Sequence, residues 1–382
     1  MKILLVRLRE IGDVVFTTPA VRAIRRRFPD AHITYVVEPA ASAIVEHNPH
    51  IDELIIAPRP SGISGLRSEL GLIRRLRAAA YDIAIDFHGG PRASILTWLS
   101  GASERVGYAV VGRSWMYTRL IARPRELRPR HSVVNQWDLL AALDIGPPDR
   151  AGYPVEMALG DRTANALAER LARAGVRGDH RLIVMHVSAG NPFRRWPVES
   201  FAAVAAGLAG RDPARRVVFT SGPSDRQAAE RAIVEARALL GDDRGRVLEC
   251  GEFSLSELRA LVDRAAVYIG GDSGPMHVAA TSHVPIVSLY GPTLPARSAP
   301  WRAALWPAEP VEVTGLECRP CDQRSCLPGD FRCLIWIHPQ QVIEAAERAL
   351  AGWQPAVEGA ASIQRDEAPR RQRATGESTG NT

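Results

Sequence analysis

The segment GGDSGPMHVAA, residues 270–280, brings an acid, a hydroxyl and a histidine together between two apolar runs. Ser273, Gly274 and the free amides that follow could present N–H groups to a phosphate at the start of a helix, where the helix dipole favours an anion. His277 would add a donor from the first turn. The segment contains neither GxGxxG nor a Gly-Lys-Ser/Thr sequence, so it disfavours a dehydrogenase or a P-loop kinase.

A second acid, Asp13, lies in GDVVFTTPA, directly after the first apolar run of the chain. A carboxylate at this place could accept a proton, and a positioned base contributes about 10²–10⁴-fold to a reaction rate. On local grounds alone, N-capping of the next helix is the simpler explanation of Asp13.

Three further charged residues follow apolar runs in the second half of the chain. Arg194 and Arg195 precede a predicted helix near Pro197, and paired guanidinium groups at a helix start can clamp an anion. Asp225 follows the turn at FTSGP, where an acid in a nucleotide-binding sheet often contacts ribose or base. Two solvent-facing arginines and a plain helix cap are the competing explanations.

Short apolar runs alternate with helical patterns along most of the chain, which is typical of parallel sheets covered on both faces. The predicted strands lie at 2–8, 32–37, 53–57, 82–86, 182–187, 216–220, 246–250, 266–270 and 285–290. A stretch rich in Pro, Arg and Gly at 122–160 separates two such series. The pattern therefore predicts an α/β protein of two doubly wound domains, with ligands at the carboxyl ends of the strands.

Length and charge narrow the possible functions. A chain of 382 residues is long for one core, and it has no apolar run of about 18 residues that could span a membrane. Charges interrupt the amino-terminal MKILLVRLRE, which disfavours a signal peptide and indicates a cytoplasmic protein. The net charge is +6, and all but one of the 48 basic residues are arginines.

The basic cluster at 122–131 has three possible explanations. It could be a solvated face, a nucleic-acid site, or a surface attracted to an anionic membrane or an acidic acceptor. No interleaved aromatic residues or known binding motif accompany the cluster, so we expect no nucleic-acid partner.

Four of the five cysteines, Cys318, Cys321, Cys326 and Cys333, fall in one short segment. In a cytoplasmic chain the spacing C-x₂-C-x₄-C-x₆-C suggests a structural zinc or iron–sulfur site before it suggests disulfides. The alternative is a set of reduced thiols in a loop before the last predicted helix.

Taken together, these segments resemble glycosyltransferase family 9, the heptosyltransferases that build the inner core of bacterial lipopolysaccharide. DSGPMHVAA followed by VPIVSLYGPT is similar to the family's Asp-(Ser/Thr)-Gly-x-x-His-x-Ala-Ala signature, and GDVVFTTPA is similar to its amino-terminal Gly-Asp element. The resemblance covers about residues 1–350. It implies the GT-B fold, in which two Rossmann-like domains face each other across a cleft.

The resemblance also implies a division of labour. Residues 1–155 would form an acceptor domain, 156–353 a nucleotide-sugar domain, and 354–382 a disordered tail. Asp13 would be the catalytic base of an inverting transfer. The contacts to the donor sugar and phosphates would come from Arg194, Arg195, Asp225, Asp272, Ser273, Gly274 and His277.

The implied substrates are a nucleotide-sugar, most simply ADP-heptose, and a lipopolysaccharide core or related glycolipid at the inner membrane surface, where the enzyme could be peripheral. No Asp-x-Asp motif follows a predicted strand, which favours metal-independent transfer without a cofactor. The family usually has a lysine where this chain has Arg194, and a planar guanidinium is not equivalent to an ammonium group at a phosphate. A different nucleotide-sugar, a non-catalytic nucleotide-sugar-binding protein and a metal-bearing interaction protein are the alternatives.

Overall fold

The structure is a computed structural model that describes residues 1–122, 130–187 and 189–351. Its first sheet is fully parallel, with the strand order β3-β2-β1-β4-β5-β6. These strands are β1 (Lys2–Val6), β2 (His32–Val37), β3 (Glu53–Ile56), β4 (Ile83–Asp86), β5 (Glu104–Tyr108) and β6 (Arg119–Ile121).

The second sheet is also parallel and has the order β12-β11-β10-β7-β8-β9. Its strands are β7 (Arg181–His186), β8 (Arg215–Thr220), β9 (Val247–Leu248), β10 (Ala265–Gly271), β11 (Ile286–Tyr290) and β12 (Ala308–Glu312). Each sheet reverses its strand order next to its first strand, which is the place where doubly wound folds bind ligands.

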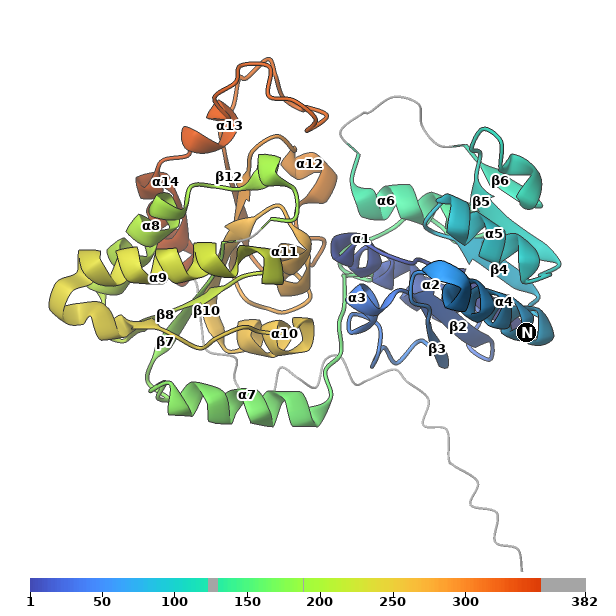
Figure 1. Cartoon of the computed structure of the whole chain (residues 1–382), viewed down its shortest axis with the longest axis horizontal. Coiled ribbons are helices and arrows are strands. Elements are labelled where there is room, and N and C mark those ends of the chain that lie inside the picture. Colours follow the sequence, from blue (N-terminus) through green and yellow to red (C-terminus); the bar gives the residue numbers. More distant parts are fainter. Residues whose placement is uncertain (123–129, 188, 352–382) are drawn as a thin grey trace, which may run out of the picture.

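Helices cover both faces of each sheet (Figure 1). The first half contains α1 (Ile11–Val15), α2 (Thr18–Arg27), α3 (Pro39–Ser42), α4 (Gly62–Ala78), α5 (Pro91–Leu99) and α6 (Ser132–Trp137). The second half contains α7 (Asp161–Arg173), α8 (Val198–Arg211), α9 (Arg226–Leu240), α10 (Leu255–Asp263), α11 (Gly274–Ala279), α12 (Pro295–Ser298), α13 (Arg332–Ile335) and α14 (Pro339–Ala351). Short 3₁₀ turns lie at Ser114–Met116, Asp138–Leu143, Pro192–Arg194, Pro223–Asp225 and Gly241–Arg246.

Alternating side chains of β1 show why this sheet needs helices on both faces. Ile3 and Leu5 enter one buried cluster, while Leu4 and Val6 enter the cluster on the opposite face, and all four are fully buried. Successive strand residues point to opposite faces, so an apolar run of this kind requires two covered faces.

The α/β class and the two Rossmann-like sheets predicted from the sequence are confirmed. All nine predicted strands are present, although the one expected at 246–250 shrinks to β9 (Val247–Leu248). Ser254 and Glu257 form a capping box at the start of α10. Strands β5, β6 and β12 were not predicted, because ERVGY, RLI and AEPVE are short and carry charges or proline at or near sheet edges.

Two predictions fall largely outside the described residues. These are the disordered tail at 354–382 and most of the basic cluster at 122–131. Within the described residues, no helix is long and apolar enough to cross a membrane.

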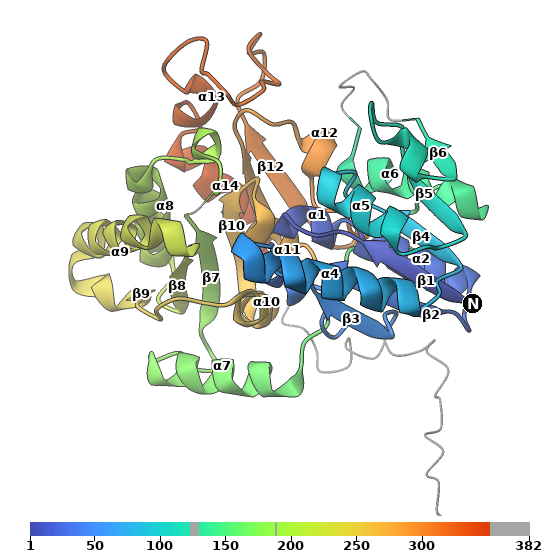
Figure 2. The ribbon, with the colours of Figure 1, turned by 45° about the vertical axis from the view of Figure 1, so that its right-hand side comes forward.

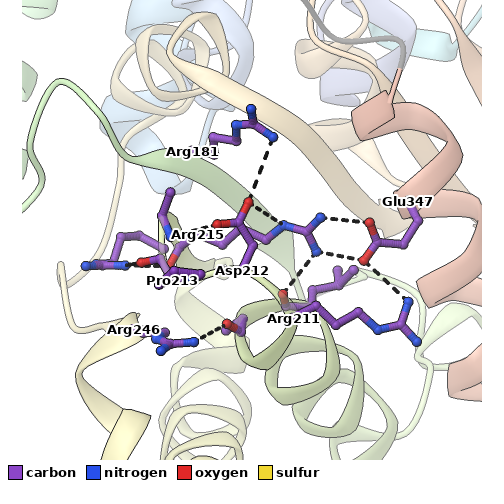
Figure 3. Close-up of polar contacts among 11 residues, drawn as sticks. Arg181, Arg211, Asp212, Pro213, Arg215, Arg246 and Glu347 are labelled. Atoms are coloured by element: carbon purple, nitrogen blue, oxygen red, sulfur yellow. Dashed lines mark hydrogen bonds and ion pairs between the residues drawn. The ribbon is translucent and has the colours of Figure 1, made fainter.

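The last described helix, α14, is fixed to the second sheet by a buried arginine (Figure 3). Arg215 at the start of β8 makes two 2.7 Å hydrogen bonds to the two carboxylate oxygens of Glu347 on α14. The hydrogen bonds and charge of Arg215 outweigh partial burial and lower the pKa of Glu347. Such a bidentate pair sets the orientation of α14 as well as holding it in place.

Candidate active site

Asp13 lies on α1, the first helix after β1, and forms an ion pair with Arg7. Arg7 is nearly buried and also donates to the main-chain oxygen of Phe87 at 2.7 Å, so the guanidinium is held at the carboxyl ends of β1 and β4. The Asp13 side chain is 38% exposed. Asp13 lies in the first turn of α1, whereas Glu10 occupies the N-cap position, so the N-cap explanation of Asp13 is wrong.

Asp272 follows β10 and is buried at the start of the turn into α11. Thr293 Oγ1 donates to its Oδ2 at 2.6 Å, Arg194 Nη1 lies 3.4 Å from the same oxygen, and His277 Nε2 lies 3.6 Å from Oδ1. Burial would raise the pKa of this carboxyl, but these polar and charged partners outweigh it and lower the pKa to about 2. Asp272 is therefore ionised at neutral pH.

Three buried polar atoms around this turn have no hydrogen-bond partner among the described residues: Asp272 Oδ1, Ser273 Oγ and His277 Nδ1. A buried polar atom without a partner costs about 1–3 kcal/mol. Their gathering at the end of one strand indicates a site that a polar ligand would complete.

The two halves of the molecule meet where α1 faces α11 (Figure 1). A β-carbon on Gly12 would lie 2.5 Å from His277 Cδ2, and a β-carbon on Gly274 would lie 2.8 Å from Ile11 Cβ. The Phe16 ring packs on the His277 ring with centroids 4.4 Å apart. Glycine at both positions thus lets the helix that carries Asp13 touch the helix that follows Asp272.

The two predicted arginines occupy different places. Arg194 donates from Nη1 to the Asp272 main-chain oxygen at 3.1 Å and from Nε to Gln323 Oε1 at 2.6 Å. Arg195 forms a 3.0 Å ion pair with the buried carboxylate of Asp225. The explanation of Arg194 and Arg195 as two solvent-facing arginines is therefore wrong. Asp225 stands at the N-cap of α9 but makes no side-chain capping bond, so it is not a plain helix cap.

Comparisons with known proteins identify the family of this chain. The sequence profile of glycosyltransferase family 9 (heptosyltransferase) matches residues 70–328, more than half of the chain. The chain belongs to glycosyltransferase family 9.

Relatives and solved structures support the assignment over nearly the whole chain. Lipopolysaccharide heptosyltransferase 3 of Escherichia coli K12 is 26% identical over 346 residues, which cover 90% of this chain and 96% of that protein. A solved family 9 structure from Veillonella parvula is 27% identical with a TM-score of 0.77, covering 92% of this chain and 98% of that one. The Escherichia coli heptosyltransferase WaaC, solved with ADP, is 19% identical with a TM-score of 0.65, covering 91% and 100%. The predicted GT-B fold and glycosyltransferase activity are confirmed.

Several residues of this candidate site were not predicted as site residues. Arg7 and Thr293 both lie just beyond a strand end, and their charge or hydroxyl at that place was the signal that could have identified them. Gln323 contacts Arg194 from far along the chain, and nothing in its local sequence indicates that contact. His88 lies two residues after the end of β4. Burial, together with the charges of Arg7 and Arg9, lowers its pKa to about 4.

The four cysteines of the predicted metal site line a pocket of about 350 Å³, together with Phe193 and Phe331. All four are free thiols. Within the described part of the chain, however, no three His, Cys, Asp or Glu side chains are arranged to hold a metal ion. The arrangement does not fit the predicted zinc or iron–sulfur site, and no step below involves a metal.

The cysteine segment is nevertheless joined to the site. Gln323 lies between Cys321 and Cys326, and its Oε1 accepts bonds from Asn191 at 3.0 Å and from Arg194 at 2.6 Å. Cys321 N donates to the Pro292 oxygen at 3.2 Å, next to Thr293. The segment therefore supports the loops that hold Asp272.

Proposed function

We propose that this enzyme transfers a heptose from ADP-heptose, with inversion and without a metal, onto a lipopolysaccharide core or a related glycolipid. Residues 1–155 would hold the acceptor and 156–353 the donor. The observation that carries the proposal is the contact of Gly12 with His277, because it brings the Arg7-paired carboxylate of Asp13 to the polar turn at Ser273.

In this proposal Asp13 is the catalytic base. Arg7 holds one carboxylate oxygen, Oδ2, and the Asp13 side chain remains partly exposed. The carboxylate takes the proton of the acceptor hydroxyl as the hydroxyl oxygen attacks the anomeric carbon of the donor. The bond from the anomeric carbon to the diphosphate breaks with its electron pair going to the leaving oxygen. A base held in this way gives typically about 10²–10⁴-fold in rate.

The leaving diphosphate would lie at the turn between β10 and α11. Among the described residues, Ser273 Oγ and His277 Nδ1 have no hydrogen-bond partner there, and Arg194 supplies a positive charge beside them. These groups are fixed before the reaction, so they stabilise the charge that develops on the leaving oxygen. Asp272 is itself an anion, so we assign its carboxylate to positioning Arg194 and His277, with Oδ1 left for a sugar hydroxyl. Gly274 lets Ile11 of α1 pack directly against the start of α11.

The adenine nucleotide would lie near the ends of β7 and β8. Asp225 and Arg195 form a charged pair there, and His186 Nδ1 lies 2.9 Å from Thr220 Oγ1. The solved heptosyltransferase WaaC holds ADP, and the relative in Escherichia coli K12 is named for lipopolysaccharide. These likenesses support an ADP-sugar donor and an acceptor related to lipopolysaccharide. The proposal places that acceptor at the inner face of the inner membrane, with the enzyme in the cytoplasm or peripheral on that face.

The experiment is a transfer assay on wild-type and Asp13→Asn protein with ADP-heptose and a heptose-terminated core acceptor. We expect Asp13→Asn to lower turnover by about 10²–10⁴-fold. Stabilisation against heat by ADP should be retained, because the substitution leaves the ADP-binding groups in place. Glu46→Gln, on an exposed turn, is the matched control and should leave turnover unchanged.

Three results would contradict the proposal. Asp13→Asn turnover equal to wild type would remove Asp13 from the mechanism. Wild-type binding of nucleotide-sugars without any transfer would favour a non-catalytic binding protein. A thermal shift with GDP or UDP but not with ADP would instead identify a different donor.

A further inference from the structure

The helix α4 is unusual in this fold because little of it is buried. Among its 17 residues only Leu76 is fully buried, while Leu72 and Ile73 pack partly against the core. Ile63, Leu66 and Leu70 are 79%, 60% and 46% exposed. Their spacing of three and four residues puts them on one side of the helix, so the amino-terminal half of α4 offers an apolar stripe to solvent.

The neighbouring helix α5 adds exposed aromatic surface. Trp98 on α5 and Trp115 in the following 3₁₀ turn are 40% and 61% exposed, with ring centroids 5.0 Å apart. Both α4 and α5 cover the same face of the first sheet (Figure 2). Arg92 of α5 makes two hydrogen bonds to Glu69 of α4 and fastens the helices together. We call Ile63, Leu66, Leu70, Trp98 and Trp115 the α4–α5 face.

The charge around this face is strongly positive. Residues 59–78 contain five arginines and one acid, Glu69, whose carboxylate is taken up by Arg92. Arg67 and Arg74 are exposed and have no ion-pair partner among the described residues. Arg59 and Arg75 pair with Glu38 and Glu53 from outside this stretch. Arg67 and Arg74 therefore stand beside the apolar stripe without an acidic partner among the described residues.

We infer that the α4–α5 face docks on an anionic lipid bilayer, with its aliphatic residues entering the headgroup boundary and Arg67 and Arg74 contacting lipid phosphates. Exposed leucines and isoleucines beside arginines are typical of helices that lie in a membrane interface. Tryptophan side chains favour the same depth, because the ring is apolar and its N–H is polar. A nucleic-acid site would not explain the apolar stripe.

This inference deepens the proposed function, because a glycolipid acceptor anchored in a bilayer requires the enzyme to work at that surface. The face belongs to the half that is proposed to bind the acceptor. Docking through this half would bring the acceptor side of the cleft to the lipid, while the donor half could remain in the aqueous phase.

The first test measures sedimentation of the full chain with vesicles of phosphatidylcholine alone or mixed with phosphatidylglycerol. We expect binding to the mixed vesicles, and we expect Leu66→Gln/Leu70→Gln to weaken it by at least about tenfold through loss of buried apolar area. The matched control is Val234→Gln/Leu239→Gln on α9, which removes two equally exposed apolar side chains from the other half and should bind as wild type does.

The second test measures how much the positive charge contributes to vesicle binding. Arg67→Gln/Arg74→Gln should weaken binding to the mixed vesicles by about thirtyfold, because each arginine near an anionic surface contributes roughly a factor of five. Arg231→Gln/Arg264→Gln, two exposed arginines of the other half, should bind as wild type does. The difference in affinity between wild type and Arg67→Gln/Arg74→Gln should also become smaller as the salt concentration rises.

The inference is overturned if wild-type protein does not bind the mixed vesicles, or if the α4 variants bind as tightly as the controls. It is also overturned if the Leu66 and Leu70 substitutions only dissociate a dimer, seen by light scattering, since the face would then join two copies of this chain. Transfer activity on a core acceptor without its lipid distinguishes the membrane-docking inference from the proposed function. That activity should be unchanged in the α4 variants, and its absence in wild type would count against the proposed function instead.

Discussion

Gly12 of α1 lies against the imidazole ring of His277 of α11, and a β-carbon at residue 12 would be 2.5 Å from His277 Cδ2. The two residues belong to different halves of the molecule. This contact fixes how closely Asp13, the next residue, can approach the buried polar atoms at Ser273 and His277. The geometry of the site therefore depends on the absence of one side chain.

We predict that Gly12→Ala lowers kcat/KM by about 10²-fold, because α1 or His277 must shift by a sizeable fraction of an ångström or more. Steady-state transfer kinetics measure the effect. Gly71→Ala is the control, since a β-carbon there meets nothing within 4 Å. Alanine in that exposed helix should leave kinetics unchanged and raise the unfolding free energy by about 0.5–1 kcal/mol. Equal kinetics for Gly12→Ala and Gly71→Ala would contradict the tight contact.

We predict that Arg194→Ala weakens ADP binding and lowers turnover by about tenfold or more, since hydrogen bonds that involve a charged group contribute about 1.5–3 kcal/mol. Arg194→Lys should recover part of the loss, because the ammonium keeps the charge but cannot reach both Gln323 and Asp272 as the planar guanidinium does. Calorimetric titration with ADP measures the first effect and the transfer assay the second. Wild-type affinity in Arg194→Ala would exclude this residue from the donor site.

The low pKa of Asp272 predicts a pH dependence of stability. Its folded-state pKa of about 2 lies below the ordinary value of 3.8, so ionisation of Asp272 stabilises the fold. That contribution, about 2 kcal/mol, is fully present above pH 3.8 and is lost as the pH falls from 3.8 to about 2. Denaturant unfolding across this range should show a steeper loss for wild type than for Asp272→Asn. Parallel pH profiles for the two proteins would contradict the assignment.

The cysteine pocket predicts an order of thiol reactivity. Cys318, Cys321 and Cys326 are partly exposed, whereas Cys333 is buried, and burial raises the pKa of its thiol. We therefore expect a thiol reagent to modify the first three before Cys333, as mapped by mass spectrometry. Burial also raises the pKa of the Cys250 thiol, so this cysteine should react slowly. About one equivalent of zinc or iron, protecting all four clustered thiols together, would restore the metal hypothesis.

Much of the architecture was determined by local sequence. Apolar runs such as HITYVV and LIVMHV must be covered on both faces, so they predict parallel strands and, by their alternation with helical patterns, two doubly wound sheets. Edge strands β6 and β12 carry too little apolar sequence for such a prediction, and their pairing with β5 and β11 is set by the neighbouring strand. The residues that follow each strand end were also identifiable, since parallel sheets gather their ligands there.

Tertiary structure alone decided which of those residues meet. The sequence placed Asp13 and Asp272 after strands, but nothing local indicates that Arg7 pairs with Asp13, that Gln323 reaches Arg194, or that Thr293 donates to Asp272. These contacts join positions separated by up to 129 residues, and they depend on how loops pack after both sheets have formed. Opposite charges and small residues are common everywhere in this arginine-rich chain, so only their positions in space distinguish the active site from an ordinary surface.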